Sequence, residues 1–242
     1  LKNMVAELER SNLELDQYAF VASHDLKSPL QAIFQLASWI EEDCVEVLPE
    51  DSKKHLLLLK ERIKRMEKLL ADLLLFSRIS KEKYKFESIN VEKLIKNVFE
   101  FNSVSKRFQL VVKQCDIYVL LPRIPLELIV RNVLSNAIKH HDKSEGSITV
   151  AYRKDLEINT ISICDDGPGI PPNMHQKVYE MFHTLKPRDT TEGSGLGMAI
   201  VIKAAAQFDG KVNIVSDGKR GTCIELCWKD NNKHEDMNNV AD

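Results

Sequence analysis

Apolar side chains recur at alternating steps of three and four residues through the first 80 positions of this chain. This spacing predicts helices with one apolar stripe rather than strands, whose side chains alternate at every second residue. From Leu1 to about Val47 there is no glycine, and Pro29 is the one proline, so we expect one long helix. The Pro-Glu-Asp-Ser segment at 49–52 supplies turn and N-cap residues before a second helix. The stripe comprises Leu1, Met4, Leu8, Leu15, Tyr18 and Ala22, with Ser11 as a polar exception, and then Leu56, Leu59, Ile63, Met66, Leu70, Leu73 and Ser77.

Two such helices predict a helical hairpin over residues 1–80. The stripe has the spacing of a coiled-coil seam, and a seam must be covered by a partner helix. A lone hairpin leaves apolar surface exposed, so two copies pairing into a four-helix bundle are the simplest solution, and we expect a homodimer. Periodicity alone is equally consistent with a coiled coil or linker that carries no chemistry.

After Ser80 the pattern changes to short β-like runs that alternate with helices, which predicts a second domain of α+β class over residues 85–229. Residues 80–84 form the expected linker, and the polar segment 230–242 is expected to be a disordered tail. We expect strands at Lys85–Ile89, Phe108–Lys113, Ile117–Leu120, Ser147–Arg153, Thr160–Cys164, Lys211–Val215 and Thr222–Trp228, and helices at Val91–Ser105, Pro125–His141 and Gly195–Phe208.

The formal net charge of -2 gives no basic surplus, so nucleic acid is not an expected partner. No run reaches the ~18–20 apolar residues of a membrane span, and no signal peptide precedes the first helix, so we expect no direct membrane contact in this part of the protein. Because the chain begins at Leu1, we expect a fragment of a longer protein. An upstream sensor domain, or a membrane anchor, would then lie outside this fragment.

The five cysteines are odd in number and scattered, with no Cys-x-x-Cys pair, which favours reduced thiols and a cytoplasmic location. Cys223 and Cys227 lie four residues apart in an alternating segment and should share one face of a strand. No nearby cluster of histidines and cysteines completes a zinc site around them, so packing is their expected role.

His24 stands in the segment Ser-His-Asp-Leu-Lys-Ser-Pro-Leu at 23–30, within the first predicted helix. An exposed histidine on a helix usually has no function, but here Asp25 follows directly, Ser28 lies four residues on, and Pro29 would interrupt the helical hydrogen bonds. A neutral imidazole can attack a phosphoryl group while a neighbouring carboxylate accepts its proton. The segment therefore predicts a nucleophile and a base. By itself it is equally consistent with an exposed histidine that has no function.

Asn132 and Asn136 lie four residues apart in a predicted helix, so both amides project from one face, with Lys139 on the next turn. Amide oxygens are suitable ligands for Mg²⁺, which bridges to substrate phosphates. Apolar residues at 133, 134, 137 and 138 mark the adjacent faces as core. The alternative is that these asparagines are ordinary solvent-exposed polar residues. That alternative explains either asparagine alone more readily than it explains both together.

Asp165 ends a predicted strand and is followed by Gly167 and Gly169. A carboxylate beside glycine backbone can accept a hydrogen bond from an exocyclic amine such as that of adenine. Taken alone, the segment fits an ordinary glycine-rich turn better.

Gly193, Gly195 and Gly197 open the last predicted helix, where exposed backbone N–H groups can bind phosphate. The motif is weak evidence, because its spacing is not that of a Walker loop and no strand directly precedes it as in a Rossmann unit. The polar run 186–192 before it has the composition of a mobile lid.

These four motifs occur in an order that resembles the sensor histidine kinases, and the resemblance covers the chain from the first helix to Trp228. It implies a dimeric four-helix bundle followed by an α/β sandwich, the ATPase fold shared with gyrase, Hsp90 and MutL. The implied reaction is ATP-dependent phosphorylation of His24 and transfer of the phosphoryl group to an aspartate on a response-regulator receiver domain.

The resemblance also implies residue roles. His24 would be the phosphoacceptor, Asp25 its base, and Ser28 a residue that helps to position water for dephosphorylation of the partner. Asn136 and Asn132 would hold Mg²⁺ on the phosphates of ATP. The other implied nucleotide-site residues are Lys139, His140, Asp165, Gly167, Gly169, Phe182, Lys186, Arg188, Gly193, Gly195, Leu196, Gly197 and Thr222.

Two positions depart from the family pattern. Residues 121–125 lack the Asp-Pro that is common before the asparagine helix, so this helix starts without its usual acidic cap. Position 28 carries Ser where Thr or Asn is commoner, which puts dephosphorylation in doubt. Two alternatives remain: a conformational ATPase, in which a hydrolytic glutamate would be expected where Asn132 stands, and a non-catalytic dimeric relay module.

Overall fold

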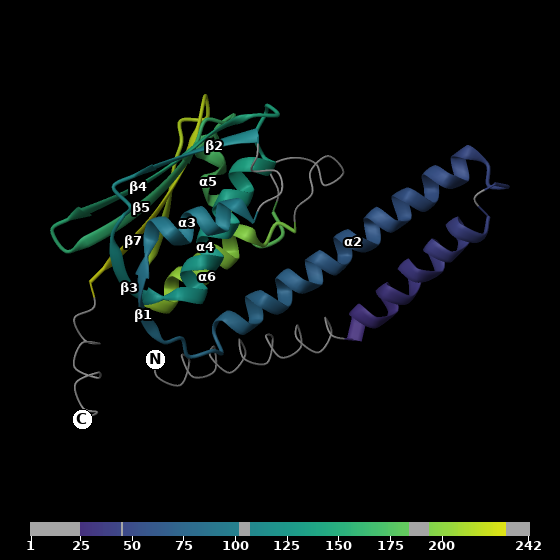
Figure 1. Cartoon of the computed structure of the whole chain (residues 1–242), viewed down its shortest axis with the longest axis horizontal. Coiled ribbons are helices and arrows are strands. Elements are labelled where there is room, and N and C mark those ends of the chain that lie inside the picture. Colours follow the sequence, from purple (N-terminus) through teal and green to yellow (C-terminus); the bar gives the residue numbers. More distant parts are fainter. Residues whose placement is uncertain (1–24, 45, 102–106, 184–193, 231–242) are drawn as a thin grey trace.

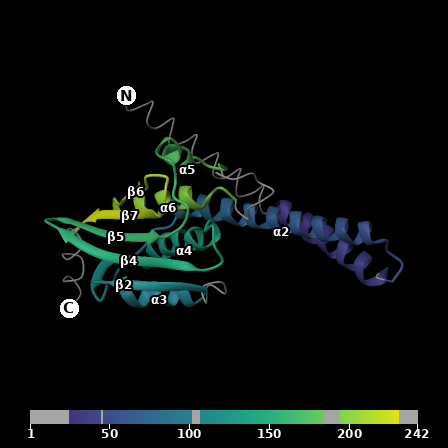
Figure 2. The same cartoon turned by 90° about the horizontal axis from the view of Figure 1, so that it is seen from above.

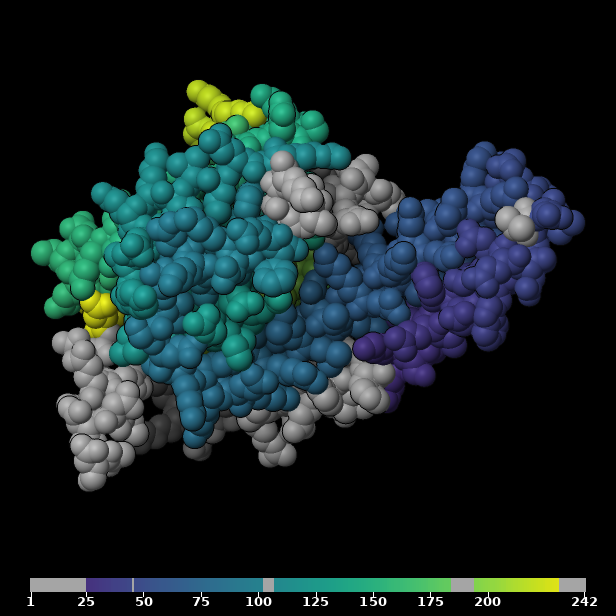
Figure 3. Space-filling view, viewed as in Figure 1, coloured from purple at the N-terminus to yellow at the C-terminus, as the bar shows by residue number. Residues whose placement is uncertain are grey.

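The computed structural model describes residues 25–44, 46–101, 107–183 and 194–230. The chain forms a helical hairpin and an α/β domain, and the hairpin extends from the domain as an arm (Figures 1 and 3). The first helix is described over residues 25–43, and it continues through Pro29. The second, α2, spans Glu50–Ile79 and begins directly after Pro49, which serves as its N-cap without a side-chain hydrogen bond. The side-chain cap expected from residues 49–52 is therefore not formed.

The two helices of the hairpin bury only a narrow seam against each other. Leu30, Ala37 and Ile63 are buried, and Lys60 Nζ forms an ion pair with Glu41 Oε2 at 2.6 Å between the helices. A wide apolar surface stays exposed on the single chain. Its exposed members include Leu26, Ile33, Leu36, Trp39, Ile40, Leu57, Leu58, Leu59 and Met66.

The α/β domain is built on a five-stranded sheet with the strand order β2-β4-β5-β7-β6 (Figure 2). The β2–β4 pair is parallel and the other three pairs are antiparallel. A separate antiparallel pair joins β1 and β3. The strands are β1 Phe86–Asn90, β2 Phe108–Lys113, β3 Tyr118–Pro122, β4 Gly146–Asp155, β5 Ile158–Asp165, β6 Lys211–Val215 and β7 Thr222–Lys229.

Helices cover one face of this sheet and enclose the core (Figure 1). The larger ones are α3 Val91–Glu100, α4 Arg123–Lys139 and α6 Gly197–Ala205, and the short ones are η2 Pro172–Met174, α5 His175–Val178 and η3 Ala206–Phe208. Ile161, Ile163, Ile224, Leu226 and Trp228 alternate along β5 and β7 and point into the core. The α+β architecture expected from the sequence is confirmed, and each expected strand lies within about two residues of an observed one.

Two of the five cysteines are not thiols. A disulfide joins Cys164 of β5 to Cys223 of β7, so the expectation of reduced cysteines is wrong for this pair. The two residues stand opposite each other in the register of the strands, a long-range pairing that sequence spacing does not reveal. Cys44, Cys115 and Cys227 are free.

Within the described parts of the chain, each helix is too short or too polar to cross a membrane.

Candidate nucleotide-binding site

A cavity of about 580 Å³ opens between the α/β domain and the second helix of the hairpin. One face of α4 forms its floor, and its sides are formed by the end of β5, the start of β7, and Ser194, Gly195, Gly197 and Met198. Lys68, Asp72 and Leu75 of α2 complete the wall. Its volume is within the range of small-molecule sites.

The two asparagines of α4 face this cavity together. Asn132 donates its side-chain N–H to the backbone oxygen of Leu128 at 2.8 Å, which fixes the orientation of the amide. A Cβ built on Gly197 would lie 3.4 Å from Asn132 Oδ1 and 3.7 Å from the Asn136 amide. The absence of a side chain at position 197 therefore keeps open a space lined by two amide oxygens. Such a space suits a hard cation bound to phosphate oxygens.

The first turn of α6 lies beside these amides. Gly195 precedes the helix at φ +71°, and a Cβ there would come within 2.7 Å of the backbone of Phe182. Phe182 N–H donates to the oxygen of Gly195 at 2.9 Å, so the two segments are held in contact. The N-cap, Leu196, makes no side-chain capping bond. Amide groups at such a helix start attract anions, because their N–H groups lack intrahelical acceptors.

Asp165 lines the same cavity, at the point where β5 ends. Its Oδ1 accepts the backbone N–H of Gly167 at 2.8 Å. Burial raises the pKa of Asp165, while hydrogen bonds from the backbone of Gly167 and Thr222 act in the opposite direction. The Gly221 N–H donates to Gly167 O at 2.7 Å, and this bond closes the turn around the carboxylate. Asp165 thus presents a half-buried acceptor at the cavity wall.

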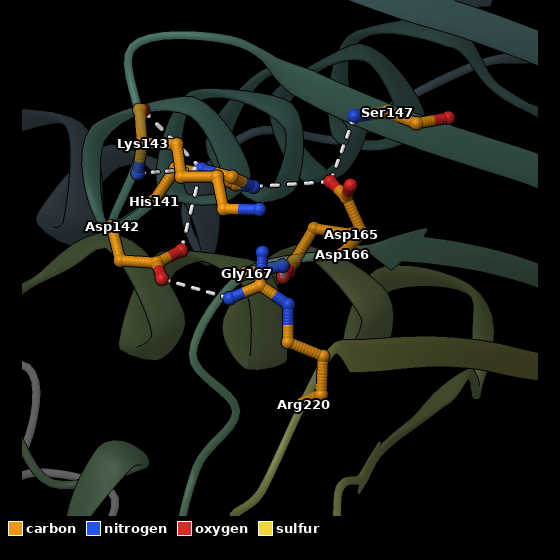
Figure 4. A network of polar contacts seen from close by, with 8 residues as sticks. All are labelled: His141, Asp142, Lys143, Ser147, Asp165, Asp166, Gly167 and Arg220. Carbon is orange, nitrogen blue, oxygen red and sulfur yellow. Dashed lines mark hydrogen bonds and ion pairs between the residues drawn. The ribbon is translucent and has the colours of Figure 1, made fainter.

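A polar network outside the cavity supports this turn (Figure 4). Lys143 N–H donates to His141 Nδ1 at 3.0 Å, so His141 Nε2 carries the proton and donates to Asp166 Oδ1 at 3.0 Å. The same oxygen accepts the Ser147 N–H at 2.7 Å. This backbone bond is the main reason that the pKa of Asp166 is lowered. His141 is almost fully buried, with 1% of its side chain exposed.

A second ion pair extends the network to the turn before β7. Arg220 Nη1 donates to Asp142 Oδ2 at 2.8 Å and lowers the pKa of that carboxyl. The end of α4 is thereby linked both to the Asp165 turn and to the loop that precedes Thr222. Sequence reasoning missed His141, Asp142, Asp166 and Arg220. The only feature of the sequence that could have indicated them is their position next to His140, Asp165 and Gly221.

The contact between α2 and α6 was also not predicted. Ile79, Leu128, Leu196 and Ile200 form a buried cluster, against which Leu73, Leu75 and Phe76 of α2 pack. Lys203 Nζ lies 3.9 Å from the centroid of the Phe76 ring. The hairpin therefore contacts the nucleotide domain through α6, the helix whose first turn lines the cavity.

The structure brings most of the predicted nucleotide-site residues together. The cavity is lined by Asn132, Asn136, Lys139, His140, Asp165, Gly169, Gly195, Gly197 and Thr222. Three others do not line it: Gly167 lies beneath the Asp165 carboxylate, Leu196 is buried in the α2–α6 cluster, and Phe182 contributes its backbone contact to Gly195.

The predicted catalytic residues of the helical hairpin are either exposed or outside the residues that the structure describes. Asp25 and Ser28 are exposed on the first helix and do not line the cavity. His24, Lys186, Arg188 and Gly193 lie outside the described residues, as do all the stripe positions from Leu1 to Ala22 and residues 231–242 of the expected tail. Among the described residues, no group of three or more His, Cys, Asp or Glu side chains is placed to hold a metal ion.

Comparison with known families gives two matches in sequence. Residues 15–82 match the His Kinase A (phospho-acceptor) domain, and residues 122–232 match the histidine kinase-, DNA gyrase B-, and HSP90-like ATPase. The first match contains His24, and the second contains the cavity residues of α4, β5, α6 and β7.

Individual relatives agree with these matches. The chain is 30% identical over 237 residues to cyanobacterial phytochrome B of a Nostoc species, covering 95% of this chain and 31% of that protein. It is 30% identical over 230 residues to the methanogenesis regulatory histidine kinase FilI of Methanothrix harundinacea, covering 93% of this chain and 26% of that protein. The chain thus spans less than a third of the length of either relative.

Full-length ShkA, solved in complex with AMPPNP, has the same fold with a TM-score of 0.66 at 21% identity, covering 88% of this chain and 45% of that one. The phosphoacceptor match, the ATPase match that follows it and the shared architecture together identify this chain as a member of the sensor histidine kinases, comprising the catalytic core of such a kinase.

Proposed function

We propose that this core binds ATP in the cavity, transfers the γ-phosphoryl group to His24, and passes it on to an aspartate of a response-regulator receiver domain. The observation that carries the proposal is the convergence of three groups on one cavity: the Asn132 and Asn136 amides, the start of α6 and the Asp165 carboxylate. These groups match the parts of a nucleotide with its bound cation. Amide oxygens are ligands for the cation, N–H groups at a helix start bind phosphates, and a carboxylate accepts a hydrogen bond from an exocyclic amine.

In this arrangement Asp165 accepts a hydrogen bond from the adenine amino group. The triphosphate runs toward Gly195 and Gly197 at the start of α6. Asn136, with Asn132, would hold Mg²⁺, whose positive charge would offset the negative charge of the phosphates. Lys139 and His140 add polar groups at the same end of α4. The arrangement uses no hydrolytic carboxylate on α4, where Asn132 stands.

Residues of the helical hairpin carry out the phosphoryl transfer. An imidazole nitrogen of His24 attacks the γ-phosphorus, the new N–P bond forms, and the P–O bond to ADP breaks. Asp25 accepts the proton released by the imidazole. In the next step a carboxylate oxygen of a receiver aspartate attacks the phosphorus, the N–P bond breaks, and the imidazole of His24 leaves and regains its proton. Ser28 assists dephosphorylation of that partner in this scheme.

The division of labour assigns residues 1–80 to dimerisation and phosphotransfer and residues 85–229 to nucleotide binding. The exposed apolar surface of the hairpin, including Leu36, Trp39 and Ile40, supports pairing with a second copy into a four-helix bundle. The greater length of the curated relatives supports a sensor domain elsewhere in the parent protein. We expect this core to lie in the cytoplasm, where ATP is supplied.

Labelled ATP tests the proposal. With Mg²⁺, the protein should acquire label that is stable to base and labile to acid, the behaviour of phosphohistidine. His24→Gln should abolish the label, whereas His55→Gln, a matched change on the exposed surface of α2, should retain it. Label that persists in His24→Gln would contradict the proposal. Rapid hydrolysis of ATP without phosphoprotein would instead favour a conformational ATPase.

A further inference from the structure

The disulfide between Cys164 and Cys223 stands beside the candidate nucleotide site. Cys164 directly precedes Asp165, and Cys223 directly follows Thr222. The two cysteines are paired in the β5–β7 register, and so are Asp165 and Thr222. Each cysteine of the disulfide is therefore adjacent in sequence to a residue that lines the cavity, Asp165 or Thr222.

The position of the bridge makes it accessible. Ile163 and Ile224, the sequence neighbours of the cysteines, point into the core, so Cys164 and Cys223 point to the opposite face of the sheet. The larger helices lie on the core side (Figure 1). Both cysteines are partly exposed rather than buried. A small thiol or disulfide in solution can reach sulfur atoms placed in this way.

The other cysteines differ from this pair. Cys115 is 1% exposed, and burial raises the pKa of its thiol, which disfavours the reactive thiolate. Cys227 shares the outer face with Cys223, but Thr160 is its opposite residue on β5. Cys164 and Cys223 are thus the cysteines that the described sheet places directly opposite each other.

We infer that Cys164 and Cys223 form a reversible redox modification site, and that formation of their disulfide tightens nucleotide binding at the adjacent cavity. The second part rests on the proposed function, since it assumes that the cavity binds ATP. The disulfide tethers the strand ends that carry Asp165 and Thr222. Tethering reduces the conformational freedom that these residues lose when a ligand binds.

The chemistry is thiol–disulfide exchange with a low-molecular-weight disulfide such as oxidised glutathione. The thiolate of one cysteine attacks the glutathione disulfide, forms a mixed disulfide and releases one glutathione thiolate. The thiolate of the second cysteine then attacks the protein sulfur of the mixed disulfide and expels the second glutathione thiolate. Two electrons pass from the protein sulfurs to glutathione disulfide, and the two thiol protons pass to solvent or to the released glutathione. Reduction by a dithiol reverses both steps.

The strands should remain paired in either state. β5 and β7 are aligned over eight residue pairs, from Ile158 with Lys229 to Asp165 with Thr222. Only the covalent tether near the last pair is lost on reduction. The effect should therefore appear at the cavity, with the fold retained.

Two measurements on the same samples test the inference. The chain is equilibrated with mixtures of reduced and oxidised glutathione, quenched with acid, denatured and alkylated. Intact mass should change from five alkylated cysteines to three as the mixture becomes more oxidising, and peptide mapping should find Cys164 linked to Cys223. In the same series, a fluorescent ATP analogue with Mg²⁺ should bind more tightly to the oxidised form, by about fivefold or more.

Variants separate the possible causes. Cys164→Ser should lose the dependence of affinity on redox state, and Cys227→Ser should retain it. Circular dichroism of reduced and oxidised wild-type protein reports whether the fold is kept, so the test does not depend on how well a variant folds. A pair that remains dithiol, or remains disulfide, throughout the series would overturn the inference.

Equal affinity for the ATP analogue in the two states would also overturn it, but would leave the proposed function intact. Failure of both states to bind the analogue would count against the proposed function itself. In that case the mass measurement still decides whether the redox site exists.

Discussion

The surroundings of Asp165 set both the pKa of its carboxylate and its ability to accept a hydrogen bond. Its carboxylate is partly desolvated at the end of β5, which raises its pKa, yet backbone N–H groups hold it in place. The ionised form is the better acceptor for an amino group. Nucleotide affinity should therefore weaken as the pH falls through the pKa of Asp165, which lies above the ordinary aspartate value of about 3.9.

Asp165→Asn should weaken binding of the fluorescent ATP analogue by about tenfold or more, the effect of losing one hydrogen bond to a charged acceptor. The near-identical size of asparagine should preserve the turn, so circular dichroism should be unchanged. Asp155→Asn, an exposed change at the far end of β4, is the control and should bind like the wild type. Normal affinity in Asp165→Asn would show that this carboxylate does not contact the nucleotide.

At the scale of elements, the polar network joins three parts of the chain that are distant in sequence. His141 lies just after α4, Ser147 lies in β4, and Asp166 directly follows β5. Asp166 accepts hydrogen bonds from both of the others. This bridging role, rather than contact with the cavity, is the expected contribution of Asp166.

Asp166→Asn should lower the free energy of unfolding at pH 7 by about 0.5–1 kcal/mol, a range suited to a partly exposed charged acceptor. Because the pKa of Asp166 is lowered in the folded state, its stabilisation is present above the unfolded value of about 3.9 and is lost as the pH falls through the folded value. Urea titrations of both proteins should therefore converge in acid. Glu157→Gln is an exposed control, and a constant difference at all pH values would contradict the argument.

Much of the secondary structure could be predicted because it depends on local patterns. Strands β2 and β6 were predicted with their observed bounds, and α4 was expected at Pro125–His141 but is found at Arg123–Lys139. Asn132 and Asn136 could be placed together because helical spacing alone puts them on one face.

What could not be predicted depends on packing between distant segments. The Cys164–Cys223 pairing requires knowledge that β7 lies beside β5. The role of His141 requires the end of α4 to meet the turn after β5. Lys68 and Asp72 reach the cavity only because α2 packs against α6. None of these contacts leaves a periodic signal in the sequence.

At the scale of the whole molecule, the hairpin and the nucleotide domain meet through a small apolar contact. Phe76 packs beside Leu196 and Ile200, and Lys203 lies over its ring. A contact of this size can open without unfolding either part. The position of the hairpin relative to the cavity should therefore depend on a few side chains.

Phe76→Ala should loosen this contact and speed tryptic cleavage at Lys81, Lys83 and Lys85 by about fivefold or more, through a loss of roughly 1–3 kcal/mol of packing free energy. Limited proteolysis followed by mass spectrometry measures the rate. Leu58→Ala removes an exposed apolar side chain from the other end of α2 and serves as the control. Equal cleavage rates would show that the Phe76 contact does not hold the two parts together.

The order of strands in the sheet also has a consequence for biosynthesis. The last strand, β7, lies between β5 and β6 in the sheet, and its first residue, Thr222, lines the cavity. A ribosome must therefore release the chain as far as β7 before the site can be completed. Shorter nascent chains would leave one long edge of β5 unpaired, a surface prone to wrong pairing. Capture of nucleotide would then mark the moment at which synthesis and folding of this domain are both complete.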